Sequence, residues 1–129
     1  MEHLKIVGAH FRPPAKAILA ALPLGSELEL RPEPTNQFDP NAIAVWVHTA
    51  KIPHTVRDDL DLRTKGFGYS ADEIFAQSEF HLGYIPKEEA KRIVSLFPPG
   101  EAVGGKLACL PQGDPSIRFT LPTQESQNG

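Results

Sequence analysis

The sequence has little of several features that mark particular classes of protein. Its 129 residues include one cysteine, Cys109, which excludes an internal disulfide framework and is typical of a reducing compartment. No apolar run approaches the roughly 18 residues that a membrane-spanning helix needs. The N-terminal Met1-Glu2-His3 lacks the charged and apolar pattern of a signal peptide. These absences predict a soluble, cytoplasmic protein.

Basic charge and reactive groups are also sparse. The formal net charge is −3, so any contact with nucleic acid must come from a local patch. The five histidines show no His-x-x-x-His spacing and no Cys-x-x-Cys pair is present, which argues against a zinc site. No nucleophile or phosphate-cradling glycine loop stands beside Asp39, the carboxylate that could act as a general base. We therefore expect no metal, no cofactor and no enzymatic activity.

Hydrophobic periodicity predicts a mainly β fold with two short helices. Alternating or continuous apolar segments separated by turn residues favour six strands, at 4–11, 27–31, 42–48, 80–85, 102–110 and 116–121. Prolines in the first turn begin the two helices, at 13–21 and 86–97. A chain of this length buries one core, so residues 1–122 are expected to form a single domain, followed by a disordered tail at 123–129.

Residues 31–47 combine a turn-rich polar loop with an apolar strand. They read Arg-Pro-Glu-Pro-Thr-Asn-Gln-Phe-Asp-Pro-Asn-Ala-Ile-Ala-Val-Trp-Val. Pro40 restricts Asp39 to extended geometry, and Asp and Asn side chains bond nearby backbone. The apolar residues that follow are typical of a strand buried on both faces. Phe38 and Asp39 are therefore expected to sit rigidly at the entrance of that strand.

This run, with Leu82-Gly83-Tyr84-Ile85-Pro86 further along the chain, resembles the HIRAN domain. The string Asn-x-(aromatic)-Asp-x-Asn-Ala-(aliphatic)-x-Val carries most of the resemblance, which covers most of residues 3–121. It implies a small OB-like or SH3-like β-barrel of about six strands. The family is found fused to helicase-like DNA repair ATPases and alone in small bacterial and phage proteins, and this chain resembles the latter.

The resemblance also implies a binding site. DNA-binding members of the family capture a single-stranded 3′ end, with the motif aspartate at the terminal hydroxyl and aromatic neighbours stacking on bases. Here these residues are Asp39 and Phe38. An ionised carboxylate repels phosphates but accepts hydrogen bonds from a hydroxyl, so such a group suits a free strand end.

At another part of the family's site an arginine-aromatic pair follows the glycine of the first strand. This chain has His10-Phe11 there, with Arg12 one place later, and a neutral histidine is a poorer phosphate ligand than arginine. Arg12 could substitute only if the strand has a bulge, because a shift of one residue reverses the face of a side chain. The predicted DNA-binding residues are His10, Phe11, Arg12, Arg31, Phe38, Asp39, Tyr84 and Lys87.

Each of these residues also has a purely structural interpretation. Phe38 could fill part of the core, and Asp39 could simply form a turn with local backbone amides. Arg31 could pair with Glu29 or Glu33 on the surface. The joint match to one family's site favours the functional interpretation.

Residues 49–79 depart from the family pattern. In the family a short hairpin joins the two strands that this segment connects here. This insertion has four basic and six acidic residues, a net charge of 4 − 6 = −2. Its 66–69 stretch is expected to be flexible, and the capping-box string at 70–73 predicts a short helix to about residue 77. Without a continuous apolar face, the insertion is predicted to be a surface decoration, or alternatively a lid or partner-binding loop.

Two functions remain open from the sequence. The first is a non-catalytic module that binds single-stranded DNA, particularly its 3′ end, in DNA repair, replication or processing of foreign DNA. The second is a protein-interaction module on the same barrel, with the acidic insertion at 49–79 contacting a protein partner. Burial of Phe38 and Asp39 would favour the second.

Overall fold

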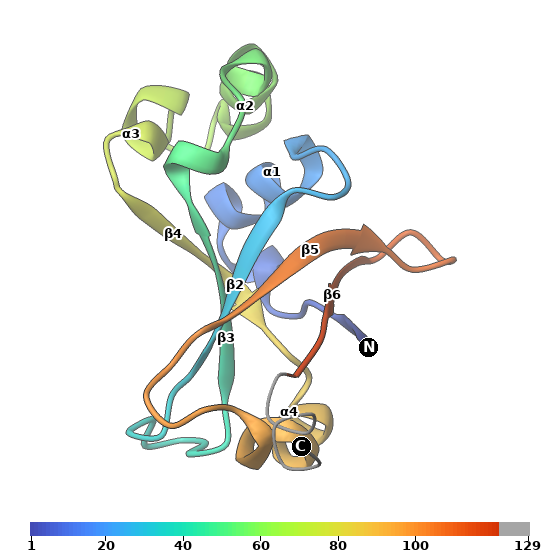
Figure 1. Ribbon diagram of the computed structural model, residues 1–129. Helices are drawn as coiled ribbons and strands as arrows, with labels where there is room; N and C mark the ends of the chain where they lie inside the picture. Colours follow the sequence, from blue (N-terminus) through green and yellow to red (C-terminus); the bar gives the residue numbers. More distant parts are fainter. Residues whose placement is uncertain (122–129) are drawn as a thin grey trace.

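The computed structural model describes residues 1–121, and this part of the chain is mainly β structure with short helices (Figure 1). The strands are β1 (Glu2–Lys5), β2 (Glu27–Pro32), β3 (Ile43–His48), β4 (Glu79–Tyr84), β5 (Val103–Cys109) and β6 (Pro115–Phe119). The α-helices are α1 (Pro13–Ala21), α2 (Arg57–Thr64), α3 (Ala71–Phe75) and α4 (Lys87–Ile93). Single 3₁₀ turns are η1 (Ala9–Phe11), η2 (Thr49–Lys51), η3 (His54–Val56) and η4 (Val94–Leu96).

The predicted mainly β fold is confirmed. The two predicted helices are α1 and the pair α4–η4, while α2 and α3 add two more within the insertion. The predicted tail at 123–129 lies outside the described residues. No helix in residues 1–121 is both long and apolar enough to cross a bilayer.

All six strands are antiparallel in one open sheet with the order β1-β6-β5-β2-β3-β4. In the β2–β3 ladder Leu30 lies opposite Val45 and Glu29 lies opposite Trp46. Leu30 and Val45 are fully buried, whereas Glu29 and Trp46 are half-buried on the other face. This alternation fixes the register, because a shift of one residue would bring the charged side chains into the core.

One bridge links the end of β4 to the segment after β1. The amide of Val7 donates to the Tyr84 carbonyl (2.8 Å), and the amide of Tyr84 donates back to Val7 (2.9 Å). A Cβ at Gly83 would lie 2.5 Å from the Val7 carbonyl oxygen, so only glycine permits this approach. The bridge supports closure of the sheet into a barrel, and that closure stays a prediction.

The first strand is shorter than predicted. It ends at Lys5, and the rest of the predicted strand 4–11 becomes the Val7 bridge followed by η1. Gly8 has φ +86°, a left-handed conformation that ends extended structure and starts the η1 turn. The residues after Gly8 therefore leave the sheet.

The insertion at 49–79 has a buried apolar face. The prediction that it lacks such a face and only decorates the surface is therefore wrong. Ile52, Leu60 and Ile74 are at most 2% exposed and belong to the main core. The predicted capping of the short helix is confirmed, since the Glu73 amide donates to the Ser70 hydroxyl at 3.3 Å. Figure 1 shows α2 and α3 with α1 at one end of the sheet and α4 at the other.

The sequence did not predict α2, because its eight residues, Arg-Asp-Asp-Leu-Asp-Leu-Arg-Thr, are mostly charged. Only Leu60 and Thr64 are buried, and they lie four residues apart on one face. The Thr64 hydroxyl donates to the Leu60 carbonyl at 2.7 Å, so its burial leaves no unsatisfied polar group. Two buried residues thus suffice to dock this helix against α1.

This packing gives a direct test with a matched control on one helix. We expect Leu60→Ala to lower the free energy of unfolding by about 2–5 kcal/mol, since it leaves a cavity in a packed core. Leu62→Ala should change it by less than about 0.5 kcal/mol, because Leu62 is 72% exposed. Urea unfolding measures both variants, and equal stability of the two would contradict core packing of α2.

Candidate functional site

The loop between β2 and β3, residues 33–42, forms the centre of the candidate site and is called the motif loop below. The Asn36 side-chain oxygen accepts hydrogen bonds from the amides of Phe38 (2.9 Å) and Asp39 (3.1 Å). Asp39 in turn accepts from the amide of Asn41 through Oδ1 (3.0 Å). These Asx-type bonds hold the loop backbone in one shape.

The motif loop presents Phe38 to solvent. The side chain is 95% exposed, so the alternative that Phe38 fills the core is wrong. Asp39 is half-buried beside it, and both the turn-forming role and a ligand-binding role remain compatible with its contacts. A fully exposed aromatic ring on a hydrogen-bonded loop is available for stacking on a ligand.

Glu33 connects this loop to β4. One oxygen of its carboxylate, Oε1, accepts from the Asn36 side-chain amide (3.0 Å) and from the Tyr84 hydroxyl (3.1 Å). Burial raises the pKa of Tyr84, and the neighbouring Glu33 carboxylate raises it further. Tyr84 therefore stays protonated and acts as the donor that fixes Glu33 and, through it, Asn36.

Arg12 and His81 adjoin Tyr84. Arg12 Nη1 donates to His81 Nδ1, and His81 Nε2 lies 2.9 Å from the Gly83 carbonyl. We infer one neutral tautomer from these contacts, with the proton on Nε2, because Arg12 can only donate. Burial and the charge of Arg12 lower the pKa of His81 in agreement with that state. The His81 ring packs edge-on against Tyr84, with centroids 4.8 Å apart.

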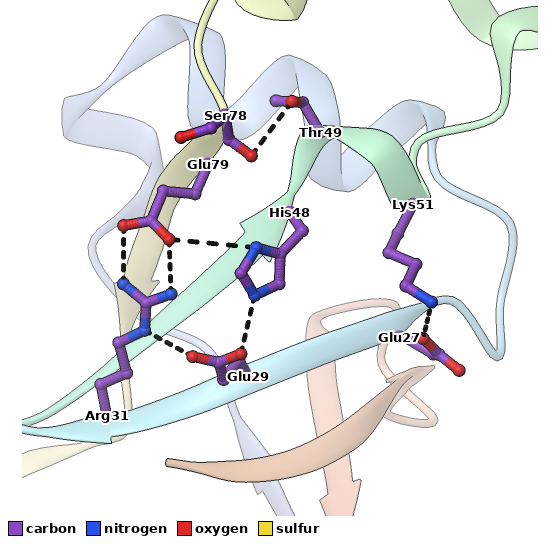
Figure 2. Close-up of polar contacts among 8 residues, drawn as sticks. All are labelled: Glu27, Glu29, Arg31, His48, Thr49, Lys51, Ser78 and Glu79. Carbon is purple, nitrogen blue, oxygen red and sulfur yellow. Dashed lines mark hydrogen bonds and ion pairs between the residues drawn. The ribbon is translucent and has the colours of Figure 1, made fainter. Parts of the chain in front are cut away.

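Arg31 is occupied by a separate network, drawn in Figure 2. Its guanidinium donates to Glu79 through two bonds (2.8 and 2.6 Å) and to Glu29 through a third (2.6 Å). It also lies over the ring of Trp46, at 4.6 Å from the centroid. These hydrogen bonds lower the pKa of Glu79, so the pair is ionised at neutral pH.

The same network includes His48, which contacts both carboxylates, at 2.8 Å from Glu29 and 3.9 Å from Glu79. Figure 2 shows that Arg31 and His48 lie between the two glutamates, so β2, β3 and β4 are joined on the outer face of the sheet. A guanidinium with three carboxylate bonds has little capacity left for phosphate. The geometry favours the structural interpretation of Arg31, although its predicted DNA contact stays untested.

The remaining predicted residues lie on two exposed segments. His10 and Phe11 form η1, with ring centroids 3.9 Å apart and Phe11 78% exposed. Lys87 is the exposed first residue of α4, after Pro86. Because the chain has left the sheet at Gly8, Arg12 reaches His81, which packs against Tyr84, without the strand bulge that the sequence argument required.

The structure thus links Arg12, Tyr84 and the motif loop with Phe38 and Asp39 through a series of contacts that His81, Glu33 and Asn36 complete. It leaves Arg31 in another network. Sequence reasoning missed the contacts of Glu33 and His81 with Tyr84, whereas the expectation that Asn and Asp side chains in this run bond nearby backbone is confirmed at Asn36. The spacing Asn-x-x-Asp is a known signal of side-chain-capped turns, but no local pattern indicates that Glu33 bonds a residue 51 positions away.

Comparisons with known proteins identify the family. The sequence matches the HIRAN domain over residues 4–122. This chain belongs to the HIRAN family. No curated protein matches it. Among solved structures, a crystal structure of a protein from Lactobacillus plantarum is similar in fold, with a TM-score of 0.55 and 20% sequence identity over 91% of this chain and 88% of that one.

The HIRAN domain is a DNA-binding module, so family membership indicates DNA as the class of partner. In this HIRAN domain the contacts of Tyr84 lead to the Arg12 guanidinium through His81. Through Glu33 and Asn36 they lead to the motif loop, which holds the exposed Phe38 and the half-buried Asp39. Within residues 1–121 no group of three or more His, Cys, Asp or Glu side chains is arranged to hold a metal ion.

The lowered pKa of His81 predicts a pH dependence of stability. Below its ordinary value of 6.5, the unfolded chain binds a proton at this histidine that the folded protein does not, so stability falls as the pH falls. We expect urea unfolding to show a smaller loss between about pH 6.5 and about pH 5 for His81→Gln than for the natural sequence. Exposed His10→Gln is the control and should leave the loss unchanged. Equal losses in all three proteins would contradict the neutral state of His81.

Proposed function

We propose that this HIRAN domain is a non-catalytic module that binds single-stranded DNA and holds its 3′ end at the motif loop. The observation that carries the proposal is the 95% exposure of Phe38 on a loop whose backbone is fixed by Asn36 and Asp39. Base–aromatic stacking contributes about 1–3 kcal/mol per base and tolerates any sequence. Because the loop backbone is fixed before binding, only the Phe38 side chain loses conformational freedom when it stacks on a base.

Asp39 is suited to a terminal hydroxyl. Its Oδ1 accepts from the Asn41 amide, and no hydrogen bond within residues 1–121 engages Oδ2. An ionised carboxylate is an acceptor only, so it favours a hydroxyl at the strand end and disfavours a phosphate there. This discrimination is the chemistry that 3′-end recognition requires.

Phosphates further along the strand need cations. Arg12 is exposed and held beside Tyr84 by its contact with His81, and Lys87 is exposed with no ion pair in the described part of the chain. With only two or three such contacts, the slope of log affinity against log salt should be roughly −1.4 to −2.1 for a short strand. Binding here requires no bond-making step, so we assign no catalytic residue.

The second candidate is a protein-interaction module that uses residues 49–79. The observation that favours it is the exposure of Leu62 (72%) and Tyr69 (43%) on this insertion, since exposed large apolar side chains are common in contact surfaces. Absence of DNA binding by the intact chain, with capture of a protein partner that Leu62→Ala abolishes, would favour this candidate over the first.

The role of Asp39 is tested by Asp39→Asn, which keeps the size and an acceptor oxygen for the Asn41 amide. We expect nearly unchanged stability but a weaker preference for a free over a phosphorylated 3′ end. Loss of a hydrogen bond to a charged acceptor corresponds to about 1.5–3 kcal/mol, or roughly 10- to 150-fold in affinity. Fluorescence anisotropy with matched strands measures the preference. Equal binding of both ends by the natural protein would leave only the turn-forming role.

Phe38→Ala is expected to act differently. It should weaken binding of free and phosphorylated ends alike, by about 1–3 kcal/mol, since stacking does not depend on the terminal group. Leu24→Ala is the control, because Leu24 is also an exposed apolar residue (69%) and lies between α1 and β2. Unaltered affinity in Phe38→Ala would remove the motif loop from the DNA site.

A further inference from the structure

A second group of basic and aromatic side chains lies where the insertion packs against α1. A hollow there is lined by His10, Lys16, Ala17, Ala20, Arg63 and Phe67. These lining residues include no carboxylate, although the chain as a whole carries a net charge of −3. A locally basic hollow on an acidic protein favours an anionic partner.

Exposed aromatic rings flank these cations. Phe67 is 59% exposed and Phe11 is 78% exposed, and the Phe11 ring lies against His10 at the edge of the hollow, with centroids 3.9 Å apart. Aromatic rings that alternate with cations are typical of surfaces that bind single strands, where bases stack and phosphates pair with the cations. An acidic peptide would use the cations but would give the rings no planar partner.

The two cations are available to a ligand. Lys16 is exposed and has no ion pair among residues 1–121. Arg63 pairs with Asp59 one turn earlier in α2, at 3.0 Å, and both side chains are about half exposed. An exposed pair of this kind is weak and is screened by salt, so the guanidinium can turn to a phosphate while Asp59 remains in water.

The η1 turn links the hollow to the candidate site along the chain. His10 lines the hollow, and Arg12, two residues later, contacts His81 beside Tyr84. Tyr84 is bonded through Glu33 to the motif loop. In Figure 1 the hollow's helices α1 and α2 lie at one end of the sheet, while α4 and the loop between β2 and β3 lie at the other. Only a DNA strand of several nucleotides could reach both the hollow and the motif loop.

We propose that this hollow binds the same DNA strand further from its 3′ end, with Lys16 and Arg63 at the phosphates and Phe11 and Phe67 against bases. This inference rests on the proposed function, since it takes the motif loop as the place where the strand ends. It gives the insertion a role in extending the DNA site. It also explains how an acidic insertion can contribute to binding DNA.

The test measures binding of the full chain to single strands of two lengths, about 3 and about 12 nucleotides, each with a free or phosphorylated 3′ end. The natural protein should bind the longer free-ended strand more tightly than the shorter free-ended strand, and this difference is the gain with length. The double variant Lys16→Gln/Arg63→Gln should lose most of that gain and reduce the salt slope for the long strand by about 1.4. Its affinity for the short strand and its preference for a free end should not change.

Phe67→Ala and Arg118→Gln complete the design. Phe67→Ala should weaken binding of the long strand alone, by about 5- to 150-fold if one base stacks on the ring. Arg118→Gln removes one positive charge from β6, where Arg118 lines a different hollow on the outer face of the sheet. It should leave the gain with length intact, and loss of the gain in this variant would place the strand across the sheet and overturn the proposal.

Two other outcomes separate this inference from the proposed function. If the natural protein prefers free ends but the double variant keeps the gain with length, the hollow serves another partner, such as an acidic protein segment, and the inference is overturned. If the gain depends on Lys16 and Arg63 but free and phosphorylated ends bind equally, the hollow is supported and the 3′-end assignment is overturned.

Discussion

The candidate site depends on the backbone bridge between Val7 and Tyr84. Its two hydrogen bonds, at 2.8 and 2.9 Å, hold the segment after β1 against the last residue of β4, and Gly83 leaves the space for that approach. The chain then turns at Gly8 and brings Arg12 to His81. Without this bridge, Arg12 and the motif loop would belong to separate parts of the surface, because no ladder joins β1 to β4 among the described residues.

Two polar networks have different roles. One joins strands of the sheet, and the other supports the loop proposed to bind DNA. The Glu29–Arg31–Glu79 network joins β2 to β4 through a guanidinium with carboxylate partners on both strands, and His48 of β3 contacts the same carboxylates. The Glu33–Tyr84–Asn36 network starts at Glu33, the first residue after β2, and leads to the exposed Phe38. Saturated hydrogen-bonding groups rigidify a structure, whereas an exposed ring and a half-used carboxylate can receive a ligand.

The insertion is part of the core as well as part of the surface. Leu60 and Ile74 are fully buried, while Leu62 and Phe67 remain largely exposed. A short charged helix can satisfy both roles, because two residues four positions apart anchor one face and leave the others to solvent. The net negative charge of the insertion is therefore a sum over the whole segment. The hollow that the insertion forms with α1 is lined by basic side chains and by no carboxylate.

The sequence by itself determined the strand order along the chain, the two proline-initiated helices, and the motif loop with its link to the HIRAN family. These features depend on local periodicity, turn residues and a contiguous string, which can be read without knowledge of distant contacts. Tertiary structure alone decided the short first strand, the helix α2, the pairing of Arg31 with Glu79 and the bond from Tyr84 to Glu33. Each of these joins residues distant in sequence or depends on burial against another element, and local patterns do not specify such contacts.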